Sequence, residues 1–315
     1  MLVHCKSPRA RALTRDQGLL FSLDKLALTA FISALALGCG EARAQDCMLK
    51  IEGMPPSVRL DYDPFLPATA PARMQFRLSN PGAQSCQADL VLVDASRQAM
   101  TRFDVGATGL GIELRPISGV SRSVTPSVFT TRMEGGETTD ILFDVAILDD
   151  AVVPAGQYSE RLMLELRQPG TGVAYEQAPV VLDLTSLPRA QMNLSGSRGD
   201  FGVGASVSVV DFGKAETGKV RQLYVQTRAN NPARLTFKSA NDGKLKIVGE
   251  GTASLDYSVR FDGSVLDLKQ VAVRDIDPPR TYAGQAFELL LTLGKVEGAQ
   301  SGNYNDELTI EISTL

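Results

Sequence analysis

Few residues of this chain could form a catalytic centre, and histidine is the scarcest of them. The only histidine is His4, and the sequence contains no tryptophan. His4 lies in a stretch that we expect to be removed on export. The mature chain would then lack Ser-His and Cys-His dyads and the usual zinc ligands. Carboxylate, lysine or tyrosine chemistry remains, and we predict a protein that is not an enzyme and uses no metal or cofactor.

Paired acidic residues are the remaining candidates for chemistry. Three pairs stand out, namely Asp61 and Asp63, Asp149 and Asp150, and Asp275 and Asp277. None has the spacing of a calcium-binding loop, so we expect turn and strand-edge roles for them. A carbohydrate-processing enzyme would need two carboxylates about 5 to 10 Å apart in one cleft, and nothing in the sequence places such a pair.

The N-terminal region has the features of a secretory signal peptide. An apolar run covers residues 26–38, and Ala42-Arg43-Ala44 has the small-x-small form of a signal-peptidase site. We predict a signal peptide at 1–44 and export of the remaining chain. Cys39 leaves a lipoprotein anchor open as an alternative. The apolar run is shorter than the roughly 20 residues that a membrane span needs.

Charge and cysteine content bound the mature chain further. Removing residues 1–44 from a sequence with 32 basic and 36 acidic residues leaves a formal net charge of -7. Without a basic patch, a nucleic-acid partner is not expected. Cys47 and Cys86 remain as one pair, which we predict to form a disulfide in an oxidising compartment. Closing a loop of about 40 residues would contribute up to roughly 4 kcal/mol on the chain-entropy model.

A repeat at an offset of 146 residues indicates two similar domains. Residues 155–166 return as 301–312, and the alternating apolar positions of 141–147 fall on those of 287–293. Alternation of this kind marks strands with one buried face, and a glycine turn between two such strands predicts a hairpin. The recurring Tyr158 and Tyr304 are expected to be structural, with ring packing and a hydroxyl bond to the backbone.

The fold class predicted from these patterns is all-β. We expect two immunoglobulin-like sandwich domains, at 45–187 and 190–315, with Leu187-Pro188 beginning the linker. The second domain shows seven candidate strands, the first of them at 206–212. No stretch argues for a long helix.

Three motifs of the second half point to a known family. They are Val210-Asp-Phe-Gly213, Tyr257-Ser-Val-Arg-Phe-Asp-Gly263 and the closing Gly302-x-Tyr304-x-Asp306. With these motifs, residues 200–315 resemble the spore coat protein U family, which includes subunits of archaic, Csu-type chaperone-usher pili. The first half resembles it more weakly, because Glu160 stands where the closing motif has aspartate.

The resemblance implies a pilin-type sandwich that lacks its last strand. A periplasmic chaperone would supply that strand first, and a neighbouring pilin subunit would replace it during assembly at an outer-membrane usher. An extended peptide that fills such a groove gains backbone hydrogen bonds and side-chain burial. Leu308, Ile310 and Ile312 of the final strand would line the groove.

The N-terminus favours a particular place in such a pilus. Cleavage after Ala44 leaves only Gln45 and Asp46 before Cys47, which gives no room for a donor strand. We therefore predict the tip subunit, with the first domain as an adhesin that contacts a receptor or surface. Clusters of exposed apolar residues often mark binding sites. The candidate side chains, all expected between strands, are Phe65, Leu66, Val105, Leu110, Ile112, Val152 and Val153.

Other functions remain open from the sequence. A structural or adaptor subunit of the same pilus would have a donor segment upstream of Gln45. A free-standing secreted binding protein would have two complete sandwiches. The two possibilities differ from the tip adhesin in whether the second domain accepts a strand.

Overall fold

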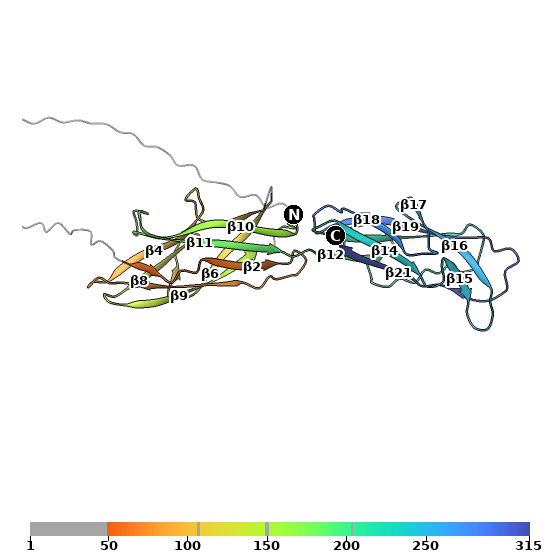
Figure 1. Cartoon of the computed structure of the whole chain (residues 1–315), viewed down its shortest axis with the longest axis horizontal. Helices are drawn as coiled ribbons and strands as arrows, with labels where there is room; N and C mark the ends of the chain where they lie inside the picture. Colours follow the sequence, from red (N-terminus) through yellow and green to blue (C-terminus); the bar gives the residue numbers. More distant parts are fainter. Residues whose placement is uncertain (1–48, 106–107, 149–150, 203) are drawn as a thin grey trace, which may run out of the picture. The chain divides into compact units, whose positions relative to one another are not determined.

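The computed structural model describes residues 49–105, 108–148, 151–202 and 204–315. Within these ranges the secondary structure is β-strand, with no helix (Figure 1). The strands form two β-sandwiches, so the all-β prediction is confirmed. The predicted signal peptide lies outside the described residues. No helix within the described ranges is long and apolar enough to cross a membrane.

The first sandwich is built from two sheets. One sheet has the order β1-β3-β9-β6-β5, with bounds Lys50–Glu52, Ala72–Ser79, Thr138–Leu148, Thr108–Ser118 and Arg102–Val105. The other has the order β2-β11-β10-β4-β8-β7, with bounds Ser57–Tyr62, Ala174–Ser186, Gly156–Arg167, Cys86–Val93, Val128–Met133 and Ser121–Arg122. Alternate side chains of each strand point inward, which lets the two sheets share one core.

Aromatic contacts show how the first core joins the two sheets. The ring of Phe129 on β8 meets Phe143 on β9 edge-on, with ring centroids 4.7 Å apart. Phe143 also stacks on Phe76 of β3 at 6.4 Å. All three side chains are buried, and edge-to-face pairs of this kind add to the stabilisation from burial alone.

The second sandwich also has two sheets, of unequal size. The larger has the order β12-β13-β19-β16-β15-β20 with β17 beside β16, and bounds Ala190–Ser195, Val220–Ala229, Gln285–Leu293, Ser254–Phe261, Lys244–Ile247, Tyr304–Asn305 and Ser264–Leu266. The smaller has the order β18-β14-β21, with bounds Ala272–Ile276, Ala233–Ser239 and Leu308–Thr314. Phe261 links the two sheets, since its ring lies 5.1 Å from Phe237 on β14.

The hairpin predicted from the repeat is wrong, because β9 and β10 belong to different sheets, as do β19 and β21. The tyrosines of the repeat nevertheless make the same hydrogen bond in both sandwiches. Tyr158 donates its hydroxyl hydrogen to the carbonyl oxygen of Pro154 at 3.1 Å. Tyr304 does the same to Gln300 at 2.7 Å, again four residues upstream. The structural role predicted for these tyrosines is confirmed. Each fixes the turn that precedes the closing strand of its sandwich.

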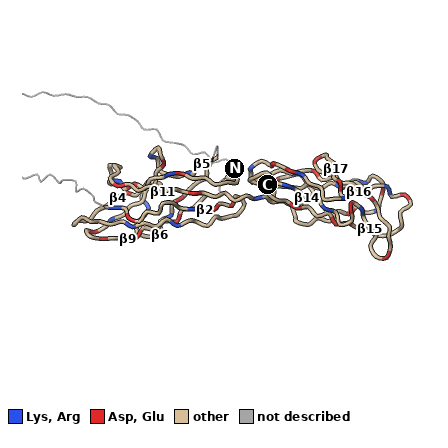
Figure 2. The backbone as a smooth tube through the Cα atoms, viewed as in Figure 1, with Lys and Arg blue, Asp and Glu red and all other residues tan. Residues whose placement is uncertain are grey.

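Charged side chains are spread over both sandwiches. Figure 2 shows acidic and basic residues distributed over the strands and loops of both sandwiches. Several form exposed pairs, such as Arg234 with Asp275 at 2.7 Å. Exposed pairs contribute little to stability, so the cores carry most of the folding free energy.

Candidate functional site: an open groove in the second sandwich

The predicted groove residues lie on a strand with a free edge. β21 pairs with β14 from Leu308 to Thr314, and no second neighbour of β21 occurs among the described strands. Leu308, Ile310 and Ile312 share one face of β21, pack against the second core and are half-buried. The backbone groups on the free edge and these side chains are therefore available to another strand.

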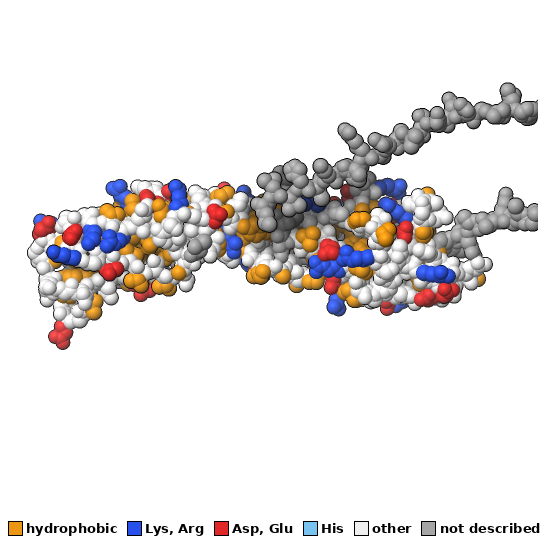
Figure 3. Space-filling model, turned by 180° about the vertical axis from the view of Figure 1, so that it is seen from behind, with side chains coloured by type: hydrophobic (Ala, Val, Ile, Leu, Met, Phe, Trp, Pro, Cys, Tyr) orange, Lys and Arg blue, Asp and Glu red, His pale blue; other side chains and the backbone are white. Residues whose placement is uncertain are grey.

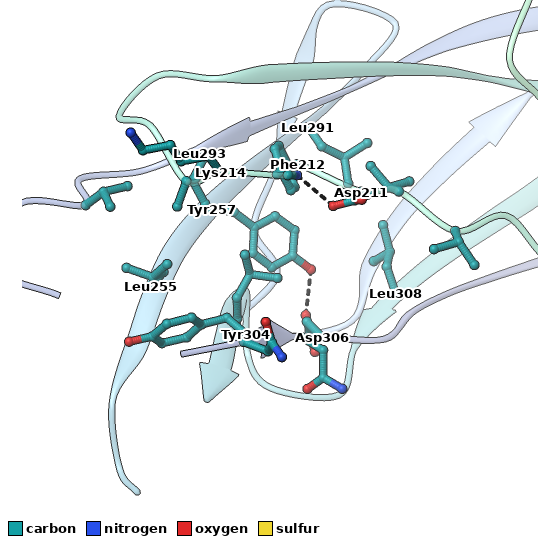
Figure 4. A pocket seen from close by; sticks show the side chains of 18 of the residues that line it. Asp211, Phe212, Lys214, Leu255, Tyr257, Leu291, Leu293, Tyr304, Asp306 and Leu308 are labelled. Atoms are coloured by element: carbon teal, nitrogen blue, oxygen red, sulfur yellow. Dashed lines mark hydrogen bonds between the residues drawn. The ribbon is translucent and has the colours of Figure 1, made fainter. Parts of the chain in front are cut away.

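A cavity of about 930 Å³ lies beside this strand. Its floor is formed by leucines of β16 and β19, namely Leu255, Leu289, Leu291 and Leu293. β21 provides one wall with Leu308 and Ile310, and residues 208–215 provide the other. Figure 4 shows these side chains pointing into a common space. We call this cavity, with its floor and two walls, the acceptor groove.

The first sandwich contains a strand at the position where the second has the groove. Its β10 corresponds to β21 under the offset of 146 residues, and β10 pairs along its whole length with β11. As a result Leu162, Leu164 and Leu166 are only 3, 2 and 0% exposed. Their counterparts on β21 are Leu308, Ile310 and Ile312. β11 buries its own Val180, Leu182 and Leu184 in the process.

The wall at residues 208–215 corrects one sequence prediction. We expected a strand at 206–212, but residues 206–219 form none. In the first sandwich, β2 ends in Leu60-Asp61-Tyr62, which matches Val210-Asp211-Phe212. Among the described strands, β2 pairs with β11 alone. The wall segment has no such neighbour among the described strands, and the missing ladder explains its irregular backbone.

Two interactions hold the wall segment beside the groove. Arg221 donates from Nε to the carbonyl oxygen of Asp211 at 2.7 Å and from its terminal nitrogen to Phe212 at 3.3 Å. Val207 and Val209 point outward and are 77 and 90% exposed. The space-filling view in Figure 3 shows apolar side chains reaching the surface of the second sandwich between charged ones.

A polar cluster closes one end of the acceptor groove. Asp306 accepts hydrogen bonds through Oδ2 from the Ser239 hydroxyl at 2.5 Å and from the Tyr257 hydroxyl at 2.6 Å. Figure 4 shows the bond from Tyr257. Burial, and then the bond to Asp306, raise the pKa of the Tyr257 hydroxyl far above its ordinary range, so it stays a donor. Because Ser239 is on β14 and Tyr257 on β16, Asp306 ties both sheets together. Sequence reasoning assigned no role to this cluster.

The predicted adhesive side chains are mostly buried. Phe65, Val152 and Val153 are buried, and Val153 belongs to the first core. Val105 lies in β5, while Leu110 and Ile112 lie in β6, so this stretch forms a hairpin and not a loop. Six of the seven candidates are therefore wrong as exposed contacts, because their side chains are buried, four of them in the first core.

Leu66 is the one candidate that reaches the surface, at 53% exposure. The structure adds two exposed apolar side chains in loops of the first sandwich, Val124 before β8 and Val173 before β11. Single exposed apolar residues are common on protein surfaces. The adhesive role of Leu66 remains a prediction.

The described residues include only one cysteine of the predicted Cys47–Cys86 disulfide. Cys86 is disulfide-bonded, whereas Cys47 and Cys39 lie outside the described residues. The Cys47–Cys86 pairing stays a prediction. Cys86 opens β4 and faces the first core, so a bridge from it would anchor the start of this strand.

The paired acids do not assemble a metal site in the described ranges. No group of three or more histidine, cysteine, aspartate or glutamate side chains is placed to share a metal ion there. The bidentate bond from Arg234 lowers the pKa of Asp275, which engages this acid in an ion pair. Asp149 and Asp150 lie outside the described residues.

Comparisons with known proteins give similarity in structure only. No family model matches the chain, and no curated protein matches it in sequence. Among solved structures, it is similar to the chaperone–tip adhesion subunit complex of the archaic chaperone-usher Csu pili of Acinetobacter baumannii, with 13% identity, a TM-score of 0.45, and coverage of 84% of this chain and 99% of that one.

Two further solved structures are similar over the same share of the chain. The CupB6 tip adhesin of Pseudomonas aeruginosa has 14% identity and a TM-score of 0.34, covering 84% of this chain and 94% of that one. The adhesive subunit of CFA/I fimbria of enterotoxigenic Escherichia coli has 14% identity and a TM-score of 0.33, covering 84% and 81%. The acceptor groove itself is therefore the basis for the proposed function.

Proposed function

We propose that the second sandwich accepts a β-strand from another polypeptide, and that the chain is a subunit of a chaperone-usher pilus. The observation that carries the proposal is the acceptor groove beside the free edge of β21. The family resemblance of residues 200–315 supplies the biological setting, with a periplasmic chaperone, an usher and a neighbouring subunit as partners.

Strand addition suits the chemistry of both parts of the groove. The free edge of β21 offers backbone donors and acceptors, and the leucine floor offers apolar surface. Burying an apolar side chain fully contributes about 1.5 to 3 kcal/mol, so a strand with three inward side chains gains several kcal/mol. Without an inserted strand, an exposed edge with these properties would promote aggregation. A chaperone that covers the edge would prevent this.

The first sandwich provides a template for the inserted strand. β11 runs antiparallel to β10 and parallel to β2, with Val180 opposite Leu162 and Leu182 opposite Glu160. By analogy, the inserted strand would run antiparallel to β21 and parallel to residues 207–212. Its inward side chains would alternate as those of β11 do.

We further propose the tip adhesin as the place of this chain in the pilus. The first sandwich already holds β11 and offers no comparable open strand beside β10, whose long edge is filled. A closed sandwich followed by an open one suits a binding head joined to a shaft. The protein would be exported through the periplasm and displayed at the cell surface.

A graft of the first sandwich's own strand tests strand acceptance. Ser313 corresponds to Arg167, so a copy of residues 168–186 placed after Ser313 would rebuild the turn and β11 on the second sandwich. We expect the graft to stabilise the second sandwich by about 3 kcal/mol or more, measured by denaturant unfolding. It should also abolish co-purification with the periplasmic chaperone encoded beside the protein.

The matched control carries Val180→Ser, Leu182→Ser and Leu184→Ser within the grafted copy, which keeps the length but removes the apolar face. This control should neither stabilise the sandwich nor displace the chaperone. Equal stability of the ungrafted and grafted proteins, with no chaperone complex for either, would contradict the proposal. It would favour a free-standing binding protein.

A further inference from the structure

The carboxylate of Asp306 has one oxygen that the rest of the protein does not use. Oδ2 receives both available hydroxyl hydrogens, from Ser239 and Tyr257. Oδ1 is buried and has no hydrogen-bond partner among the described residues. Asp306 lines the acceptor groove. Leaving a buried acceptor without a donor destabilises a protein by about the free energy of the missing hydrogen bond. We therefore expect another polypeptide to provide a donor to this atom.

The two residues bonded to Asp306 cannot supply that donor. Ser239 accepts hydrogen bonds through Oγ from the backbone nitrogens of Asn241 at 3.1 Å and Gly243 at 2.8 Å, so its single hydrogen is committed to Asp306. Tyr257 has one hydroxyl hydrogen, and it is also directed at Oδ2. The remaining apolar lining of the floor has no donor groups.

The first sandwich shows which residue of an inserted strand would face this carboxylate. Glu160 corresponds to Asp306, and it lies directly opposite Leu182 of β11. Opposite residues of an antiparallel pair project their side chains to the same face. Leu182 is buried there and brings no donor. One oxygen of Glu160 is also without a partner within the described ranges, and burial raises the pKa of this carboxyl.

We propose that Asp306 selects the inserted strand, which carries a side-chain hydrogen-bond donor such as threonine or serine at the position opposite Asp306, among otherwise apolar inward positions. This inference rests on the proposed strand acceptance. A single polar contact at the end of an apolar groove fixes the register, because a slip by one residue turns the donor outward and a slip by two moves it beside Leu308. Asp306 is thus a specificity residue for the partner strand.

Competition between two peptides tests this selection. Both have the sequence of residues 174–186, and they carry Leu182→Thr or Leu182→Val, which are nearly identical in shape. Equimolar peptides are offered to the full mature protein, and native mass spectrometry reports which one is bound. We expect the threonine peptide to be preferred about tenfold, the ratio given by 1.4 kcal/mol, since its hydroxyl reaches a charged acceptor.

Variants of the protein identify the source of the preference. In Asp306→Leu the preference should reverse. In Asp306→Asn the amide oxygen keeps the bonds from Ser239 and Tyr257, so an NH2 group replaces Oδ1. The preference should then fall several-fold, because the threonine hydroxyl no longer meets a charged acceptor. The control exchange, Val180→Thr in the peptide, faces the position of Leu308 and should be disfavoured in every protein.

The outcomes separate the two proposals. If both peptides bind equally, or if Asp306→Leu and Asp306→Asn keep the threonine preference, the selection by Asp306 is wrong while strand acceptance stands. If neither peptide nor the unmodified 174–186 sequence binds, and the graft of residues 168–186 does not stabilise the second sandwich, both proposals are wrong.

Discussion

The two sandwiches share the strand pattern of the repeat but differ in what lies beside its second strand. In the first, β10 is covered by β11 and its leucines are buried. In the second, the same positions on β21 line an open groove. The comparison shows that a hydrophobic strand pattern reports which face is apolar and does not report whether the protein itself covers that face.

The difference extends to a second segment of each sandwich. β2 is a strand in the first sandwich because β11 pairs with it along Ser57–Tyr62. The matching residues 207–212 carry a similar alternation and form no strand. The presence of β11 therefore accounts for two differences between the sandwiches. It buries the leucines of β10, and it gives β2 the partner that makes it a regular strand.

The largest expected effect is a difference in the stability that the two sandwiches lose when equivalent apolar side chains are shortened to alanine. Leu164→Ala should destabilise the first sandwich by about 3 kcal/mol, since it leaves a cavity under β11. Ile310→Ala should cost the second sandwich less than about 1 kcal/mol, because the side chain is only half-buried. Denaturant unfolding of the two variants measures both values. Equal losses would mean that the groove is already filled.

A smaller loss of stability, equal in the two sandwiches, is expected when the repeated tyrosines lose their hydroxyl groups. Tyr158→Phe and Tyr304→Phe each remove one hydroxyl bond to the carbonyl four residues upstream. Each should lower the stability of its own sandwich by about 1 kcal/mol. The same unfolding experiment provides the measurement. A loss in one sandwich alone would show that the shared hydrogen bond is not equivalent in the two.

The smallest expected effect concerns the acid that corresponds to Asp306. Burial raises the pKa of Glu160, and the charges of Asp104 and Asp94 add to this. The folded state thus holds the proton more tightly than the unfolded one, so stability falls as pH rises from the unfolded pKa through the folded pKa. Glu160→Gln should stabilise the protein at pH 7 by less than about 1.4 kcal/mol, the free energy of one pKa unit.

Unfolding midpoints between pH 4 and 8 measure this difference, which should shrink toward the acid end. Glu113→Gln is the matched control with the opposite sign. Bonds from Arg122 and Arg115 lower the pKa of Glu113, so its contribution is present above its unfolded pKa and lost as pH falls. If Glu160→Gln and Glu113→Gln shifted stability in the same direction at pH 7, the account of Glu160 would be wrong.

Much of the fold could be predicted because its pattern is local. Alternation at Leu162, Leu164 and Leu166 identifies a strand whatever its neighbours are, and the offset of 146 residues transfers it to β21. The all-β class and the apolar face of Leu308, Ile310 and Ile312 followed from that, whereas the open groove beside them was predicted from the family resemblance. Local pattern could not tell that residues 206–212 lack a partner strand, since pairing is a non-local property.

The predicted adhesive side chains were misplaced for the same reason, because their burial depends on non-local strand pairing. Glycines around Leu110 suggested a loop, yet β5 and β6 form a hairpin there whose side chains fill the core. The bonding role of Asp306 was not predicted because its partners Ser239 and Tyr257 are 67 and 49 residues away in sequence. The signal that could have indicated it was the closing motif itself, in which an acid stands at a partly buried position just before an apolar strand.

The leucine floor of the acceptor groove has a consequence for temperature. Apolar surface that water leaves on association lowers the heat capacity of the complex. The hydrophobic part of the driving force weakens on cooling, so the affinity for an inserted strand passes through a maximum and declines toward 0 °C. A complex kept on ice would then lose its strand more readily than one held at ambient temperature.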